Sequence, residues 1–341
     1  MRAAIYNPYW DTLGGGERYT ASLVSLLLKK NYKVDIEWKE KDIIKKINSR
    51  FSLDISGANI VDTVNRGDGY DFCFWLSDGS IPTLKSRTNI LHFQFPFQNT
   101  HQNILLNKMK LFRVKSVVCN SKFTKSFIDK EYGVNSEVVY PPVDISKFKK
   151  VKKENLIIYI GRFSQLTQSK NQHILVEKFK NFYDQGFTDW KLVLAGGGEV
   201  GSDEYVQKLV KKSRSYPISI LVSPSFDKIK ELYSKAKIFW SAVGDSIDEL
   251  SDPLKVEHFG MTVVEAMSTG VVPILPEKGG YKEIVKDSVN GIFWNGKEDL
   301  IRKTKKIISD EKLFDILSNE SINYAKNFDI STFEKSFEKY I

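Results

Sequence analysis

Segments rich in β-branched and aromatic residues alternate with segments of helical apolar spacing along the chain, and this alternation constrains the fold more than any other feature. In the first half we expect strands at 3–6, 33–36, 70–76, 89–93 and 116–119, and helices at 17–29 and from Asn120-Ser121 to about Asp129. Strands that alternate with helices form parallel sheets covered by helices on both faces. The first half therefore predicts one doubly wound α/β domain.

The same pattern begins again in the second half and predicts a second doubly wound domain. Strands are expected at 156–160, 191–194, 219–222, 238–241 and 271–275, and helices at 172–182, 202–212, 227–236 and 262–269. We expect the strand at 271–275 to end the run of strands.

The two runs are joined by Tyr140-Pro141-Pro142-Val143-Asp144, which can continue neither a helix nor a central strand. A polar stretch at 146–155 follows, so we place the domain join here. We expect an N-terminal domain at 1–145, a C-terminal domain at 146–325, and a C-terminal helix at 326–341 that packs back on the N-terminal domain.

The composition fits two sizeable hydrophobic cores, since 41% of the 341 residues are hydrophobic and 27% are charged. Cys73 and Cys119 cannot form a disulfide framework, which favours a reducing compartment. The sequence shows neither a signal peptide nor an apolar run near the ~20 residues of a membrane span. We expect a cytoplasmic protein.

The positive charge is concentrated in the first half of the chain. Residues 1–150 hold 23 Lys and Arg against 15 Asp and Glu, a balance of +8, while the remainder hold 28 against 27, a balance of +1. Such a bias suits nucleic acid, an anionic membrane surface or a phosphorylated ligand. A solvated lysine-rich face is an equally good interpretation of the charge by itself.

Gly14-Gly15-Gly16 lies between the first expected strand and the first expected helix. Ligands of open α/β sheets bind at that edge, and glycines let the backbone approach a phosphate or sugar closely. Gly15 and Gly16 are therefore candidate donor-binding residues, although a flexible turn also explains them. The spacing does not match a dinucleotide-binding fingerprint.

Two cations follow the first expected strand of the second half: Arg162, directly after Gly161, and Lys170, eight residues further on. Fixed cations at a turn between a strand and a helix suit a pyrophosphate, because they offset the charge of a departing diphosphate. The alternative is an ordinary pair of solvated side chains.

The most informative segment runs from Glu257 to Met267 and opens a helix. Gly260 allows a tight turn, and the amides of Met261, Thr262 and Val263 are expected to be free at the helix start. Glu265 lies about one turn into the helix, where its carboxylate can accept two vicinal hydroxyls, and Glu257 can reach a second polyol. This combination predicts a sugar-nucleotide site, with one glutamate on ribose and the other on the hexose. Acidic residues that favour a helix start explain only one of the two.

Glu257 and Glu265, with seven residues between them, resemble the paired-glutamate motif of retaining glycosyltransferases of family 4. Arg162 and Lys170 resemble that family's Arg/Lys pair, although the usual spacing is about five residues. The segments Gly14-Gly15-Gly16-Glu17-Arg18, Tyr140-Pro141-Pro142-Val143-Asp144 and Lys278-Gly279-Gly280-Tyr281-Lys282-Glu283 also fit, in family order. The versions of the motifs are similar to those of dolichol-pathway α-1,2-mannosyltransferases and bacterial group 1 glycosyltransferases.

The resemblance implies the GT-B fold, in which two Rossmann-like domains face each other across a cleft. The C-terminal domain would bind the nucleotide-sugar, and the N-terminal domain would face the acceptor. The resemblance implies that Arg162 and Lys170 bind the diphosphate, that Glu265 binds the ribose and that Glu257 binds the donor sugar. It also implies that the amides from Gly260 to Thr262 contact phosphate and sugar, and that His92 lies beside the anomeric centre.

We therefore expect a retaining hexosyltransferase that moves a mannose- or glucose-type sugar from a GDP- or UDP-hexose to a glycan or a polyprenyl-linked acceptor. No Asp-x-Asp and no spaced histidine pair occurs, so we expect no metal and no cofactor. A sugar-nucleotide epimerase of the same fold is the alternative enzyme. A non-catalytic nucleic-acid-binding protein is a remote alternative. The glutamates would repel a phosphate backbone, so we expect no nucleic-acid partner.

The segment from Asn103 to Lys115 mixes apolar residues with cations. An interfacial helix of this composition buries an apolar face in a membrane and places cations near lipid phosphates. This interpretation predicts peripheral contact with an anionic membrane at its inner face. The alternative is a helix that covers the sheet, with its leucines in the core and its lysines in water.

Overall fold

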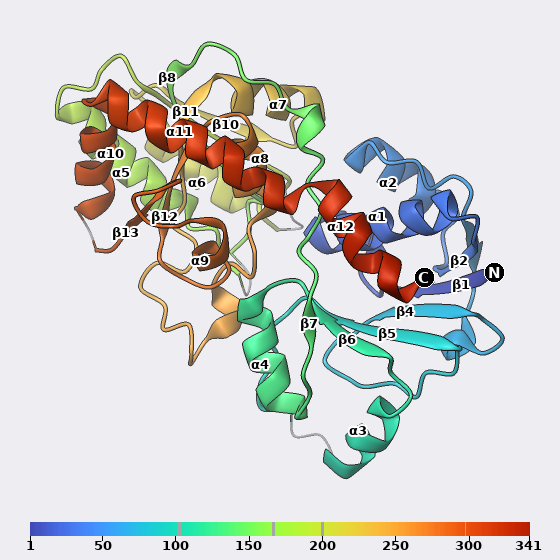
Figure 1. Ribbon diagram of the computed structural model, residues 1–341. Coiled ribbons are helices and arrows are strands. Elements are labelled where there is room, and N and C mark those ends of the chain that lie inside the picture. Colours follow the sequence, from blue (N-terminus) through green and yellow to red (C-terminus); the bar gives the residue numbers. More distant parts are fainter. Residues whose placement is uncertain (101–103, 166–167, 199–200, 297) are drawn as a thin grey trace. The chain divides into compact units, whose positions relative to one another are not determined.

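The computed structural model describes residues 1–100, 104–165, 168–198, 201–296 and 298–341. The chain divides into two compact units. Unit 1 comprises Met1–Pro142 together with Ile330–Ile341, and unit 2 comprises Val143–Asp329 (Figure 1).

Unit 1 contains a seven-stranded parallel sheet in the order β3-β2-β1-β4-β5-β6-β7. Its strands are β1 (Arg2–Tyr6), β2 (Lys33–Glu37), β3 (Asn59–Val61), β4 (Phe72–Leu76), β5 (Thr88–Phe93), β6 (Ser116–Cys119) and β7 (Glu137–Val138). Its helices include α1 (Gly15–Lys29), α2 (Ile43–Phe51), α3 (Ile104–Leu111) and α4 (Lys122–Tyr132). The hydroxyl of Ser121 accepts the Thr124 amide at 3.0 Å and so caps α4, as its position before the expected helix indicates.

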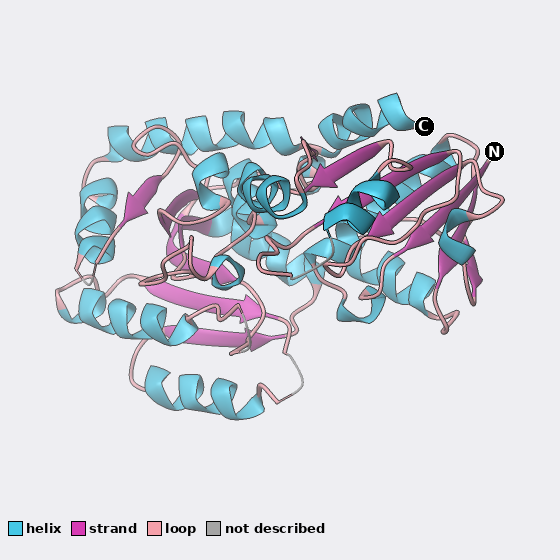
Figure 2. Cartoon of the chain, turned by 90° about the horizontal axis from the view of Figure 1, so that it is seen from below, coloured by secondary structure: helices cyan, strands magenta, loops and turns pink. Residues whose placement is uncertain are grey.

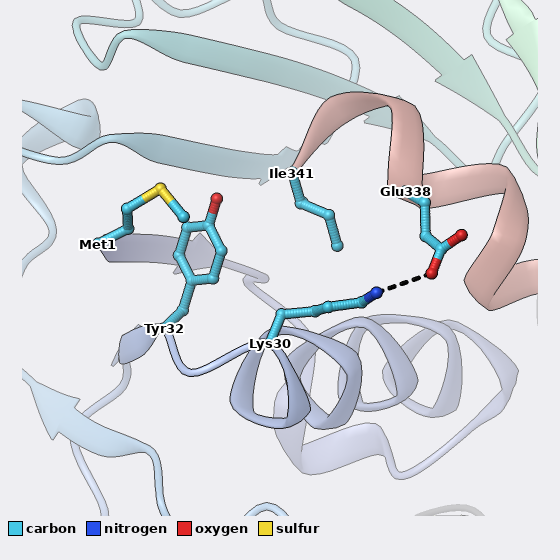
Figure 3. Close-up of a pocket in the computed structure, with 5 residues that line it drawn as sticks. All are labelled: Met1, Lys30, Tyr32, Glu338 and Ile341. Atoms are coloured by element: carbon cyan, nitrogen blue, oxygen red, sulfur yellow. Dashed lines mark hydrogen bonds and ion pairs between the residues drawn. The ribbon is translucent and has the colours of Figure 1, made fainter.

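The last helix of the chain, α12 (Ile330–Phe337), belongs to unit 1. Phe333 and Phe337 are buried in the core of this unit, and two ion pairs tie the segment to α1: Lys29 to Glu334 at 2.7 Å and Lys30 to Glu338 at 2.8 Å. A small pocket lies at this contact, lined by Met1, Lys30, Tyr32, Glu338 and Ile341 (Figure 3). None of the expected site residues lines this pocket.

Unit 2 contains a six-stranded parallel sheet in the order β10-β9-β8-β11-β12-β13. Its strands are β8 (Glu154–Ile160), β9 (Lys191–Gly196), β10 (Ile218–Val222), β11 (Ala236–Trp240), β12 (Val272–Pro276) and β13 (Ile292–Trp294). Its helices include α5 (Gln172–Asp184), α6 (Asp203–Ser213), α7 (Phe226–Lys235), α8 (Met261–Ser268), α9 (Tyr281–Ile284), α10 (Asp299–Ile308) and α11 (Glu311–Ala325). Within each unit the helices lie outside the strands (Figure 2).

Both sheets have the doubly wound order, in which the first strand lies between the second and the fourth. The central strands are continuous apolar runs because helices cover both faces, and residues 156–160 of β8 are all buried. The two Rossmann-like domains expected from the alternation are confirmed.

One expectation about the fold is wrong. The strand at 271–275 does not end the run, because β13 pairs with β12 in parallel register beyond it. Because β13 is only three residues long, it shows no hydrophobic periodicity in the sequence. Its pairing with β12 defines it as a strand. No helix in the described part of the chain is both long enough and apolar enough to span a bilayer.

Candidate functional site

The sheet of unit 2 has a switch point between β8 and β11, where the strand order reverses. In open parallel sheets the connections leave such a point toward opposite faces, which opens a crevice at the carboxyl ends of the two strands. Gly161 and Arg162 directly follow β8, and the connection after β11 leads to Glu257 and the start of α8. The candidate residues of the second half therefore gather at one edge of the sheet.

Two glycine turns press against each other at this edge. The amide of Gly161 donates to Ala195 O at 2.9 Å, and a Cβ on Gly196 would lie 2.0 Å from Gly161 O. Because backbone meets backbone here, a side chain at residue 196 would displace the turn that carries Arg162.

Lys170 and Glu257 form an ion pair with 2.9 Å between Nζ and Oε2. The ammonium also donates to Gln168 Oε1 at 2.7 Å, and Gln168 Nε2 donates to Val256 O at 2.5 Å. The two charged side chains are 11% and 19% exposed, so the pair is shielded from bulk water while a ligand can still reach it. The eight-residue spacing from Arg162 thus brings Lys170 to Glu257; Leu166 and Thr167, between them, lie outside the described residues.

The electrostatics of this edge favour an ionised carboxylate. Burial alone would raise the pKa of Glu257, but the positive charge of Lys170, with smaller contributions from His258 and Arg162, lowers it below its usual value. The Arg162 side chain is exposed, and its own carbonyl accepts Gln172 Nε2 at 2.9 Å, which ties the turn to the start of α5.

Helix α8 begins at the same edge. Gly260 precedes it with a φ of 110°, and a Cβ there would lie 2.9 Å from the Tyr281 ring. The amides of Met261 and Thr262 occupy the first turn, where helix geometry provides no intrahelical acceptor. Val263 differs from the expectation, since its amide donates to Gly260 O at 3.0 Å. The first two amides of α8 and the positive end of its dipole are the kind of groups that bind an anion.

Glu265 lies about one turn into α8, as expected, and it is buried. Its Oε2 accepts the hydroxyl of Tyr233 on α7 at 2.8 Å. The carbonyl of Tyr233 in turn accepts Thr269 Oγ1 at 2.8 Å and Lys153 Nζ at 3.2 Å. Tyr233 is fully buried, so it fixes the orientation of the carboxylate. No pattern in the sequence predicts this contact, because Tyr233 and Glu265 lie on different helices.

The late glycine motif supports the backbone of Glu257. Gly280 N donates to Glu257 O at 2.8 Å, and a Cβ on Gly279 would lie 2.2 Å from the same oxygen. Glu249 lies in the acidic loop that follows β11, residues 242–256. It accepts a hydrogen bond from Gly279 N at 2.6 Å and forms an ion pair with Lys282 at 2.5 Å. The acidic loop therefore holds the glycine motif in position through Glu249.

Gly15 and Gly16 lie in unit 1, where they form the first residues of α1. Gly14 N donates to Glu17 Oε2 at 2.7 Å, which stabilises the helix start. A Cβ on Gly16 would lie 2.0 Å from the carboxamide of Gln94, whose Nε2 donates to Gly16 O at 3.2 Å. Gly15 is exposed and Gly16 is partly exposed.

His92 also lies in unit 1, and its side chain is fully buried. Its Nδ1 lies 3.0 Å from Val118 O, and its ring stacks on Tyr19 with 4.2 Å between centroids. In the described part of the chain its buried Nε2 has no hydrogen-bond partner, and burial lowers the pKa of His92 to about 3. A place beside a donor sugar stays a prediction.

Arg162, Lys170, Glu257, Gly260 and Glu265 thus belong to one edge of unit 2, whereas Gly15, Gly16 and His92 belong to unit 1. Among the residues that the structure describes, no group of three His, Cys, Asp or Glu side chains is arranged to hold a metal ion.

Solved structures resemble the chain over its whole length. The Anabaena protein HepE, in complex with UDP and glucose, has a TM-score of 0.76 and 16% sequence identity, with 99% of this chain and 98% of that chain covered. At this identity the likeness shows the fold alone, which is that of GT-B glycosyltransferases.

Two relatives in sequence are mannosyltransferases, and the chain aligns with only part of each. Over 248 residues the chain is 27% identical to the GDP-Man:Man(3)GlcNAc(2)-PP-Dol alpha-1,2-mannosyltransferase of Dictyostelium discoideum, with 67% of this chain and 47% of that enzyme covered. Over 267 residues it is 28% identical to the O-antigen chain mannosyltransferase RfbU of Salmonella typhimurium, with 75% and 69% covered. The chain spans about half the length of the Dictyostelium enzyme. These relatives give no support to the epimerase alternative.

Residues 142–328, more than half of the 341 residues, match the family described as "Glycosyl transferases group 1". This match covers the unit that carries the Lys170–Glu257 pair and the start of α8. The chain belongs to the glycosyl transferases group 1 family.

Proposed function

We propose that this chain is a retaining, metal-independent hexosyltransferase of family 4 that uses a GDP- or UDP-sugar as donor. The observation that carries the proposal is the shielded Lys170–Glu257 pair beside the N-terminus of α8, at the switch point of unit 2. Unit 2 would bind the donor, and unit 1 would serve the acceptor.

The diphosphate of the donor would bind Arg162, Lys170 and the first amides of α8. All three carry positive charge or a positive dipole end, which attracts the negative charge of a diphosphate. As the bond from the anomeric carbon to the diphosphate oxygen lengthens, charge collects on the diphosphate, and these groups stabilise it. Lys170 would then divide its hydrogen bonds between Glu257 and phosphate.

The two glutamates would divide the rest of the donor. Glu265, oriented by Tyr233, would accept the two ribose hydroxyls, because a fixed carboxylate accepts two vicinal donors well. Glu257 would accept hydroxyls of the hexose, and its lowered pKa keeps it an acceptor across neutral pH. Neither glutamate acts as a nucleophile in this proposal. The acceptor hydroxyl attacks on the face that the diphosphate leaves, which retains the anomeric configuration, and its proton passes to the leaving diphosphate.

The acceptor would be a glycan or a polyprenyl-linked sugar. The names of two relatives support this, since one acts on a dolichol-linked oligosaccharide and the other on O-antigen chains. The mannosyltransferase names support a mannose-type donor, while the UDP and glucose bound by HepE support a glucose-type donor equally well.

The test is a transfer assay with GDP-mannose and UDP-glucose, each with polyprenyl-linked and free glycan acceptors. NMR of the product gives its anomeric configuration. An α-linked product from an α-linked donor supports the retaining assignment. A β-linked product would overturn that assignment, and donor turnover without any acceptor would instead indicate an epimerase or a hydrolase.

A further inference from the structure

Four large apolar side chains are exposed on α3 and on the turn that follows it. Leu105 is 70% exposed, Leu106 52%, Met109 66% and Phe112 92%. The interpretation in which this helix buries its leucines in the core therefore fails for these residues. Other exposed apolar side chains of the chain are scattered, such as Leu250 and Ile316 in unit 2.

The helix has a second, inward face that attaches it to unit 1. Asn107 is buried, and Leu111 and Val114 pack against the hydrophobic cluster around Phe93 and Tyr132. At about 100° per residue, positions 107, 111 and 114 fall on one side of a helix and positions 105, 109 and 112 on the other. The outward apolar stripe is thus separate from the stripe that the fold uses.

The end of the segment is held in place by hydrogen bonds. Arg113 Nε donates to Leu84 O at 2.8 Å, and Asn89 Nδ2 donates to Arg113 O at 2.9 Å. The helix lies at the margin of unit 1 in Figure 1. The fold therefore presents the apolar stripe on a fixed support.

The segment that carries the apolar stripe contains basic residues but no acidic residues. Lys108, Lys110, Arg113 and Lys115 lie between residues 104 and 115, and this interval contains no Asp or Glu. Within the described ranges, no ion pair involves Lys108, Lys110 or Lys115. By helical geometry Lys108 and Lys110 fall on opposite sides of the apolar stripe.

We propose that the outward face of α3, defined by Leu105, Leu106, Met109 and Phe112 with Lys108, Lys110 and Lys115, docks on an anionic lipid bilayer. Apolar side chains at the centre and cations at the sides match an interface whose acyl chains lie beneath negatively charged headgroups. At eight residues α3 cannot span a bilayer, so it lies in the plane of the interface.

The charge pattern argues against a second copy of the chain and against a nucleic acid as occupants of this face. A second copy of the chain would bring the same lysines together in a symmetric contact, and their repulsion would oppose it. A nucleic acid would neutralise the lysines but leave the apolar stripe in water. Binding to lipid requires no donor and no acceptor, so this inference stands or fails separately from the proposed transfer reaction.

The test is flotation with vesicles of phosphatidylcholine alone and with vesicles that contain about a third phosphatidylglycerol. At low salt the wild-type chain should float with the anionic vesicles and not with the neutral ones. Because exposed cations are screened by salt, raising the ionic strength to about 0.5 M should release most of the protein.

Two variants separate the contributions. The apolar variant, with Leu105→Ser, Met109→Ser and Phe112→Ser, should bind anionic vesicles at least tenfold more weakly. The charge variant, with Lys108→Gln, Lys110→Gln and Lys115→Gln, should lose binding at low salt to a similar extent. All six side chains lie at the surface, so neither variant should lower the unfolding temperature.

Matched controls carry the same chemical changes elsewhere. Lys39→Gln, Lys41→Gln and Lys45→Gln remove three exposed cations from another part of unit 1, and Leu250→Ser with Ile316→Ser removes exposed apolar groups from unit 2. Both controls should float as the wild type does. Absence of wild-type flotation at low salt, or equal loss in the controls and the α3 variants, would overturn the proposal. A wild-type dimer that the apolar variant dissociates, without vesicle binding, would assign the face to a second copy instead.

Discussion

The ammonium of Lys170 lies 2.9 Å from Glu257 Oε2, and this ion pair joins the two connections that leave the switch point of unit 2. Lys170 lies on the connection from β8 to α5, and Glu257 on the connection from β11 to α8. The pair therefore sets the distance between the cationic turn and the helix start. A ligand that binds both elements would find them already in place, which lowers the cost of ordering them.

Lys170→Met should weaken binding of a nucleoside diphosphate by about 1.5–3 kcal/mol, because it removes a charged hydrogen bond from a shielded site. It should also lower the unfolding temperature, since Glu257 loses its partner. In the double variant Lys170→Met/Glu257→Gln the stability should recover while the affinity stays low. Titration calorimetry and thermal unfolding measure the two effects, with Lys211→Met on the surface of α6 as control. Recovery of affinity in the double variant would contradict the phosphate role of Lys170.

Glu265→Gln should weaken binding of the free nucleotide and of the nucleotide-sugar equally, because both contain ribose. Glu257→Gln should weaken binding of the nucleotide-sugar far more than binding of the free nucleotide. Tyr233→Phe should behave as a milder Glu265→Gln and weaken both ligands about tenfold, since the carboxylate loses the bond that orients it. Dissociation constants for GDP, UDP and the corresponding sugars measure this. Equal patterns for the Glu257 and Glu265 variants would refute the division of roles.

His92 should make the folded chain acid-sensitive. Its pKa is about 3 in the folded state, because burial disfavours the imidazolium, and near 6.5 in the unfolded chain. Between these values the unfolded state binds a proton that the folded state does not bind, so stability is fully present above pH 6.5 and falls as the pH drops below it. His92→Phe should flatten this part of the pH profile of the unfolding temperature between pH 6.5 and 4.5. An unchanged acid slope would show that the burial of His92 does not govern it.

Transfer activity should survive saturating EDTA. In this account Arg162, Lys170 and the start of α8 carry the charge that a divalent metal would otherwise offset. The measurement is the rate of product formation with and without chelator, with a Mn²⁺-dependent transferase as control for the chelation. Loss of activity with EDTA and its return with Mn²⁺ would contradict the metal-free mechanism.

The sequence predicts those parts of the fold whose residues are buried on both faces. The continuous apolar run of β8 and the Ser121 cap of α4 are visible without tertiary information. The strands β3, β7 and β13 are two or three residues long and carry no period, so their pairing with a neighbouring strand defines them.

The site is predictable where function requires a particular residue type, and less so where tertiary contacts orient it. Glu257 and Glu265 follow from their spacing, whereas Tyr233 lies 32 residues from Glu265 and its contact depends on how α7 packs against α8. The segment with α3 left two interpretations open, because apolar residues occur on both of its faces. Only the exposure of individual side chains distinguishes the two interpretations: Phe112 is exposed, whereas Leu111 packs against the core.

The central claim, that unit 2 binds a nucleotide-sugar through its diphosphate, is tested most directly by titrating the wild-type chain and Arg162→Ala with GDP, UDP, GDP-mannose and UDP-glucose. We predict that at least one nucleoside diphosphate and its sugar bind the wild type and raise its unfolding temperature. Arg162→Ala should weaken both by about 1.5–3 kcal/mol while it remains folded. If none of the four compounds binds the wild type at millimolar concentration, or if the folded Arg162→Ala variant binds as the wild type does, the account of this site is wrong.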